Sequence, residues 1–150
     1  TDAEGRLILA DALTRASREG SDYIVDLATL TGACIVALGK DISGLFSSDD
    51  KLAERLIDAG VNAGERFWRM PLPVPYKQLL KSPTADLKNI GGRMAGAITA
   101  ALFLQEFVDD TPWAHLDIAG PAYRGGASGY QSHGGVGFGV RTLGHFLTAF

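Results

Sequence analysis

The sequence has little of several features that would point to particular classes of protein. It contains one cysteine, Cys34, so an internal disulfide is excluded and a reducing compartment is favoured. Basic residues are not in excess, and a net charge of −3 argues against a nucleic-acid-binding surface. No apolar run approaches the ~20 residues of a membrane-spanning helix. We therefore expect a globular protein of single-domain size, with neither nucleic acid nor a membrane as partner.

Motifs of the commonest metal and phosphate sites are also missing. The three histidines are too far apart in sequence for the close pair of a histidine-based zinc site. No G-x-x-x-x-G-K-[ST] loop and no dinucleotide fingerprint occurs, so the many glycines predict no phosphate site. Cys34 and His115 stand beside apolar residues. Each is expected to be a buried structural residue rather than a nucleophile or a metal ligand.

The most informative segment that is present is the first thirteen residues, TDAEGRLILADAL. Asp2, Glu4 and Arg6 stand at alternate positions, so in an extended segment they point to one side, roughly 7 Å apart. Two such carboxylates can reach metal ions roughly 3.5 to 4 Å apart, and the arginine fork suits an anion or an oxyanion. Thr1 followed by Glu4 also fits a helix capping box, with acidic residues near the positive end of the helix dipole. On spacing alone the helix cap is favoured, because capping boxes are common and two acidic residues do not make a ligand set, and the metal site stays open as the alternative.

The order of apolar segments predicts a three-layer α/β/α fold with a mixed, largely parallel central sheet. Ligands in such folds sit beyond the carboxyl ends of strands. The glycine-rich stretch 120–139 is expected to be a loop whose backbone approaches a ligand or another subunit closely. Helices are expected over 7–18, 50–63, 95–108 and 141–150, strands over 23–28, 44–46 and 113–118, an apolar patch over 35–38, an extended surface segment over 70–75 and one helical turn over 76–80.

Two loops and two carboxylates carry further candidate groups. The turn over 29–32 offers backbone groups for a peptide main chain, although an ordinary strand-to-helix turn capped by threonine fits equally well. Residues 85–92 are by themselves typical of a solvated loop. Asp26, inside an apolar strand, is expected to be hydrogen-bonded because an unpaired buried carboxylate is costly. Asp117, at the end of another strand, could be a third carboxylate near the site.

TDAEGRLILADAL resembles the signature segment of the leucyl aminopeptidase (cytosol aminopeptidase) family, whose members are two-metal exopeptidases. Similar segments follow in the same order: DLATLTGA (26–33), ADLKNIGG (85–92), WAHLDIAGPA (113–122) and GFGVRTL (137–143). The family's opening asparagine is missing, and the sequence has G-G-V-G at 134–137 where members often have G-A-T-G. The resemblance covers essentially the whole chain. It implies that residues 1–150 are the C-terminal part of a single metallo-aminopeptidase catalytic domain, with an incomplete sheet.

The resemblance also implies roles for individual residues. Asp2 and Glu4 would be metal ligands, with Glu4 bridging two divalent ions, zinc or manganese. Arg6 would be the catalytic residue, holding a bicarbonate-like anion or stabilising the oxyanion. The remaining ligands, a lysine and two aspartates, would lie upstream, so we expect the isolated chain to be inactive. The implied anion-binding residues are Ala3, Gly5, Arg6 and Leu30, and the implied substrate-binding residues are Ala3, Thr29, Leu30, Gly32, Asn89, Ile90, Gly135 and Val136.

The implied function is hydrolysis of the N-terminal peptide bond of peptides, with leucine and other apolar residues preferred. The family further implies a cytoplasmic homo-oligomer, a hexamer. A non-catalytic relative, or an assembly module that keeps the fold without metal chemistry, remains the alternative. The intact DAEGR segment favours the enzyme.

Overall fold

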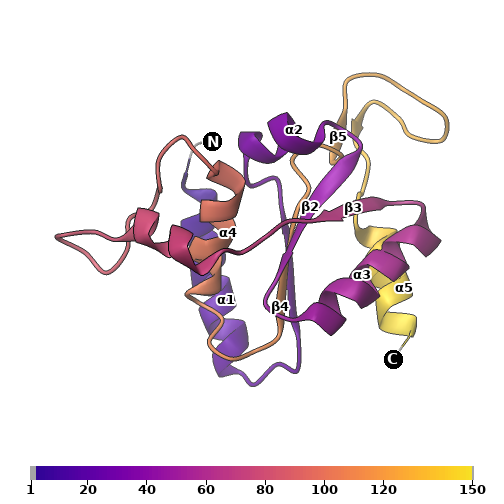
Figure 1. The fold of residues 1–150 in the computed structure, drawn as a ribbon. Helices are drawn as coiled ribbons and strands as arrows, with labels where there is room; N and C mark the ends of the chain where they lie inside the picture. The colour runs from indigo at the N-terminus through magenta and orange to yellow at the C-terminus, as the bar shows by residue number, and fades with distance from the viewer. Residues whose placement is uncertain (1–2, 150) are drawn as a thin grey trace.

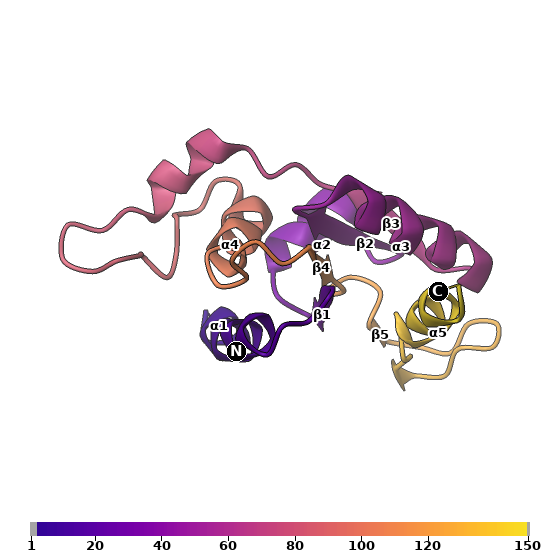
Figure 2. The same cartoon turned by 90° about the horizontal axis from the view of Figure 1, so that it is seen from below.

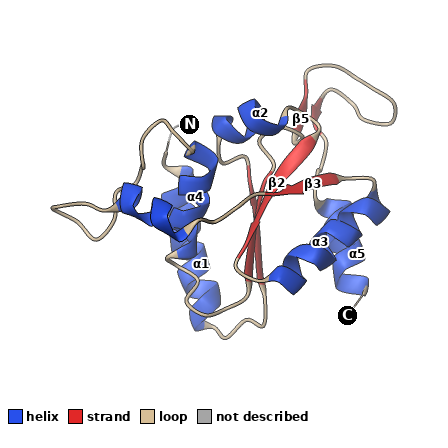
Figure 3. Ribbon diagram, in the orientation of Figure 1, coloured by secondary structure: helices blue, strands red, loops and turns tan. Residues whose placement is uncertain are grey.

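A computed structural model describes residues 3–149 of the chain (Figure 1). Helices and strands alternate along the sequence, and the strands gather in the middle of the molecule with helices outside them (Figure 3). Among residues 3–149, no helix has both the length and the apolar composition needed to cross a membrane. The elements are α1 (Gly5–Arg18), β1 (Ile24–Ala28), α2 (Gly32–Leu38), β2 (Ile42–Ser47), α3 (Asp50–Ala63), β3 (Arg66–Arg69), the 3-10 helix η1 (Val74–Leu80), α4 (Gly96–Gln105), β4 (Trp113–Asp117), β5 (Tyr123–Arg124), β6 (Gly134–Gly135) and α5 (Val140–Thr148).

The central sheet has the strand order β1-β4-β2-β3. β1 pairs with β4 in parallel and β2 pairs with β3 in parallel, whereas β2 and β4 are antiparallel. The predicted mixed, largely parallel sheet is therefore confirmed. Every residue of β4 is buried, as expected for an inner strand that is covered on both faces.

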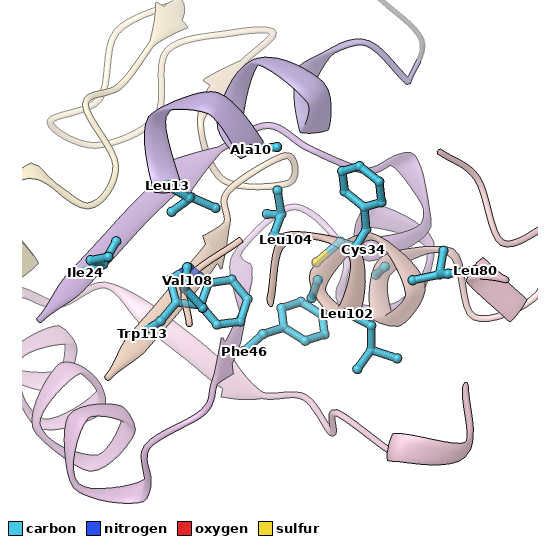
Figure 4. Packing of buried hydrophobic residues seen from close by; sticks show 13 residues of the cluster. Ala10, Leu13, Ile24, Cys34, Phe46, Leu80, Leu102, Leu104, Val108 and Trp113 are labelled. Carbon is cyan, nitrogen blue, oxygen red and sulfur yellow. The ribbon is translucent and has the colours of Figure 1, made fainter. Parts of the chain in front are cut away.

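Helices cover both faces of this sheet, and the predicted three-layer arrangement is confirmed. Figure 2 shows α1 and α4 on one side of the strands and α3 and α5 on the other. Side chains alternate along β4, so Trp113 packs in the cluster under α1 and α4, while Leu116 packs in the cluster under α3 and α5. Figure 4 shows the first cluster, in which Trp113 and Phe46 lie near helix side chains such as Leu104.

The structure adds elements that the sequence patterns did not predict. β3 is mostly exposed and lacks an apolar run, and it becomes a strand through its pairing with β2 at the sheet edge. α2 begins at Gly32, before the expected apolar patch, because Thr31 accepts a hydrogen bond from the Cys34 N–H and caps the helix. The loop 120–139 contains a short antiparallel ladder between β5 and β6.

The glycine-rich loop makes a close backbone approach at Gly120, and the contact is with the chain itself. A Cβ at Gly120 would lie 2.3 Å from the Gly39 carbonyl oxygen, just after α2. By contrast, a Cβ at Gly125 or Gly126 would meet open space. The loop is therefore anchored beside α2 at its start, and these two later glycines are not required by packing.

We predict that Gly120→Ala lowers the free energy of unfolding of the full-length protein by about 2 to 4 kcal/mol, since backbone rather than a movable side chain blocks the new methyl group. Gly126→Ala, which adds the same methyl group in open space, is the control and should change stability by less than about 1 kcal/mol. Denaturant unfolding of both variants measures the difference. Equal stability of the two variants would contradict the prediction.

Candidate active site

The carboxyl edge, meaning the edge of the sheet where β1 and β4 end, gathers most of the candidate residues. The two strands are parallel and in register, with Ala28 opposite Asp117, so the loops that follow them start side by side. α1 and α4 precede β1 and β4 and run opposite to them, which brings the starts of both helices to the same edge. Figure 1 shows the starts of α1, α2 and α4 together near the N-terminus.

Two interpretations of the N-terminal segment are corrected by its backbone. Glu4 has helical angles, φ −72° and ψ −31°, and Arg6 lies in the first turn of α1. The expected extended geometry, with alternate side chains on one side, is therefore wrong for these residues. The capping box is wrong as well, because the N-cap position is Glu4 rather than Thr1 and its side chain makes no capping hydrogen bond within the described residues. Thr1 and the proposed ligand Asp2 lie outside the described residues.

Helical geometry separates the environments of Glu4 and Arg6. The Glu4 side chain is exposed at the head of α1, where a carboxylate can face an ion or a ligand. Arg6 is only 8% exposed, and its Nη1 donates to the Asn89 carbonyl oxygen at 2.9 Å. The Asn89 Nδ2 in turn donates to the Ala3 carbonyl oxygen at 3.0 Å. These two bonds join the DAEGR and KNIGG segments, which are far apart in the sequence.

Asn89 has one polar atom whose hydrogen-bonding capacity is not used inside the described chain. Its Oδ1 is buried, and no partner for it exists among residues 3–149. A buried acceptor without a donor is costly, so a water molecule or a group beyond the described residues would complete this bond. Asn89 is thus held by two bonds to the start of the chain and keeps one acceptor atom free within the described residues.

The turn between β1 and α2 lies next to these segments. A Cβ on Gly5 would lie 3.8 Å from the Leu30 Cδ1, so the start of α1 faces this turn. Thr29 and Gly32 are exposed, and space is open around Gly32, as binding of a peptide main chain requires. The Leu30 N–H donates to Asp117 Oδ1 at 3.2 Å, so an anion would have to compete with that carboxylate for it.

The carboxylate of Asp26 lies within the sheet rather than at the site. Its Oδ1 lies 2.6 Å from the His115 Nδ1, and its Oδ2 accepts from the Trp113 Nε1 at 2.8 Å. The expectation that Asp26 is hydrogen-bonded is confirmed, and its partners are side chains of the neighbouring strand. His115 is fully buried between Phe46 and Trp113, as expected of a structural residue.

Cys34 has the properties of a structural residue. Its side chain is buried, and burial together with the nearby Asp117 carboxylate raises the pKa of the thiol to about 11. Because the reactive form of cysteine is the thiolate, Cys34 stays protonated and unreactive near neutral pH. This agrees with the sequence-based expectation.

The remaining predicted substrate-binding residues, Ile90, Gly135 and Val136, have fewer contacts with the residues at the carboxyl edge. Ile90 follows Asn89 and is half exposed. Gly135 belongs to β6, in the hairpin that pairs Tyr123 with Gly135, and the Val136 N–H donates to the Ala122 carbonyl. The hairpin lies beyond α2 from the N-terminus (Figure 1). The substrate-binding roles of Ile90, Gly135 and Val136 stay predictions.

The described residues do not form a complete metal site. Within residues 3–149, no three His, Cys, Asp or Glu side chains lie close enough together to hold a metal ion. Glu4 supplies one exposed carboxylate at the carboxyl edge. The donor set of this part of the chain therefore fits one side of a metal centre rather than a whole one.

The fold and the site define a three-layer α/β protein whose candidate functional residues gather where the parallel strands β1 and β4 end. The profile of the cytosol aminopeptidase family, catalytic domain, matches residues 1–144, and the chain belongs to this family. A probable cytosol aminopeptidase of Acaryochloris marina is 61% identical over 143 residues, which are 95% of this chain and 29% of that protein. The chain thus spans less than a third of the length of this relative.

Solved structures agree with the family assignment. The bottromycin maturation enzyme BotP in complex with Mn has a TM-score of 0.94 and 49% sequence identity, over 99% of this chain and 34% of that one. A mutant of tomato leucine aminopeptidase has a TM-score of 0.92 and 45% identity, over 99% of this chain and 29% of that one. The fold class predicted from the sequence is therefore also that of these enzymes.

Proposed function

We propose that the full-length protein is a two-metal aminopeptidase that hydrolyses the N-terminal peptide bond of peptides, with leucine and other apolar residues preferred. The observation that carries this proposal is the pair of bonds through Asn89, which join Ala3 and Arg6 to the KNIGG loop at the carboxyl edge and so bring two of the family-like segments together. Family membership and the likeness to aminopeptidase structures support the same function.

We further propose that residues 1–150 are the C-terminal part of one catalytic domain. β1 is an edge strand in the described sheet, and four of its five residues are only partly buried although the strand is mostly apolar. A strand of this kind is normally paired or covered. The partly buried β1 therefore supports a further segment of the same protein packing along this strand.

Asp2 and Glu4 would hold two divalent ions, zinc or manganese, together with upstream ligands. Divalent ions at such a site lower the pKa of a bound water and polarise the scissile carbonyl. The exposed position of Glu4 fits this role, and the Mn complex of BotP supports divalent metals in the family.

Arg6 would stabilise the developing oxyanion or hold a bicarbonate-like anion, with help from the backbone N–H groups of Ala3 and Gly5. The Leu30 N–H would help only where the anion displaces Asp117 Oδ1 from it. The bond from Arg6 to the Asn89 carbonyl fixes the guanidinium before substrate arrives, which is the condition for electrostatic stabilisation of a transition state. Thr29 and Gly32, exposed on the neighbouring turn, would bind the peptide main chain.

We propose a cytoplasmic homohexamer as the assembled form. The single buried cysteine suits a reducing compartment. Exposed apolar side chains, among them Val36 and Met94, offer surfaces for contacts between subunits.

The test of the proposed function is hydrolysis by the full-length protein of leucine p-nitroanilide and of its N-acetyl derivative. We expect release of p-nitroaniline from the first compound only, because an aminopeptidase requires a free N-terminal amine. Cleavage of both compounds would contradict the exopeptidase assignment. Absence of cleavage of either compound would favour the alternative, a non-catalytic family member or assembly module.

A further inference from the structure

We propose that Asp117 is a positioning residue that sets the turn 29–32 for substrate binding. The proposal rests on the proposed aminopeptidase function, to which it adds a residue. Asp117 ends β4 and is 1% exposed, so its carboxylate contacts the chain rather than solvent. A carboxylate at such a depth is stable only when its oxygens accept hydrogen bonds.

The donors to the Asp117 carboxylate come chiefly from the turn between β1 and α2. Oδ1 accepts from the backbone N–H of Leu30 at 3.2 Å, of Thr31 at 3.4 Å and of Ala119 at 3.2 Å. Oδ2 accepts from the hydroxyl of Thr31 at 2.6 Å, the shortest of the four bonds. Two consecutive residues of the turn are therefore fixed to the end of β4 by one side chain.

The bond to Thr31 extends this control to the start of α2. The Thr31 hydroxyl donates to Asp117 and its oxygen accepts from the Cys34 N–H at 3.0 Å, which caps the helix. The position of the hydroxyl therefore depends on both partners. Movement of the Asp117 carboxylate would displace the turn and the first residues of α2 together.

The direction of these bonds leaves the outer side of the turn for a ligand. Leu30 and Thr31 direct their N–H groups inward to Asp117, and Thr31 is buried. Thr29 and Gly32, on either side of them, are exposed. Asp117 thus holds the inner side of a turn whose outer side belongs to the proposed binding surface.

Asp26 provides a structural contrast. It is another carboxylate on the adjacent strand, but it bonds to Trp113 and His115 within the sheet. Asp117 is the carboxylate that connects the sheet to the turn, so we expect its loss to affect substrate binding and not only stability.

The test compares Asp117→Asn, Thr31→Val and Thr31→Ser in the full-length protein. Asparagine keeps one oxygen acceptor and loses the other, valine removes the hydroxyl, and serine retains it. We expect Asp117→Asn to raise the KM for leucine p-nitroanilide about tenfold or more, with kcat changed less than about threefold, since the turn contributes binding. Thr31→Val should also raise KM, whereas Thr31→Ser, which keeps the hydroxyl, should have a KM close to that of the wild type.

The control is Asp49→Ala, which removes the cap of α3 at the opposite end of the sheet, where Asp49 accepts from the Leu52 N–H. It should lower Tm and leave KM unchanged. Hydrogen exchange gives a second readout. The amides of Leu30 and Thr31 should exchange about tenfold faster in Asp117→Asn than in the wild type, and their exchange rates should be unchanged in Asp49→Ala.

The experiment separates failure of the positioning role of Asp117 from failure of the proposed aminopeptidase function. An active wild type in which Asp117→Asn and Thr31→Val keep the wild-type KM would overturn the positioning role of Asp117. Unchanged exchange of the Leu30 and Thr31 amides in Asp117→Asn would overturn it as well. A wild-type protein without activity would overturn the proposed function itself. Because Thr31→Val leaves the carboxylate in place, it tests the role even if Asp117→Asn fails to fold.

Discussion

Glu4→Gln in the full-length protein is expected to lower kcat by about 10³-fold or more and to lower the amount of bound metal. Glutamine keeps the size of the side chain but removes the negative charge that would hold a divalent ion, and metal polarisation contributes several kcal/mol to such reactions. Glu4 is exposed at the head of α1, so the substitution should leave folding intact. Steady-state kinetics and elemental analysis of the purified protein measure both effects.

Glu54→Gln is the matched control for this variant. Glu54 is an exposed glutamate on α3, on the opposite side of the sheet from α1, and its replacement should change neither kcat nor metal content. An unchanged kcat in Glu4→Gln would show that Glu4 is no ligand. The start of α1 would then be a structural feature of the fold.

The second large effect concerns residues 1–150 produced alone. We expect this chain neither to bind two metal ions tightly nor to hydrolyse leucine p-nitroanilide. Its described residues lack a group of three metal-ligating side chains, and Asp2 with Glu4 would supply too few ligands for a dinuclear site. The loss of activity relative to the full-length protein should therefore be complete within detection.

Calorimetric titration of the isolated chain with Zn²⁺ or Mn²⁺ tests this expectation, with the full-length protein as control. Circular dichroism of the same sample reports whether the helices have formed. Two submicromolar sites on the isolated chain would show that residues 1–150 hold the metal centre without upstream ligands.

The fold was predictable where one element carried its own local signals. α3 begins and ends as predicted because Asp49 caps its first turn and Gly64 adopts the left-handed conformation at its end. β3 was not predictable, since RFWR is mostly exposed and has the strand conformation only through pairing with β2. Strands at a sheet edge depend on a partner that a local pattern does not contain.

The sequence was sufficient to predict which segments form the candidate site, but not which of their residues contact one another. The resemblance identified DAEGR, the turn 29–32 and ADLKNIGG, and the structure brings these three together. Spacing gave the wrong geometry for Glu4 and Arg6, because the helix begins earlier than expected. The bond from Arg6 to Asn89 joins residues that are 83 positions apart in the sequence, and the bonds from the turn to Asp117 join residues 86 and 87 positions apart. A local sequence pattern cannot predict contacts between residues so far apart.

Metal dependence of the full-length protein tests the proposed two-metal aminopeptidase most directly. The measurement is the rate of leucine release from a leucyl peptide before chelation, after removal of metal by a chelator, and after titration with Mn²⁺ or Zn²⁺. We predict a loss of more than about 100-fold on chelation and recovery that is complete at two ions per chain. Full activity in the chelated, metal-free protein would contradict the account.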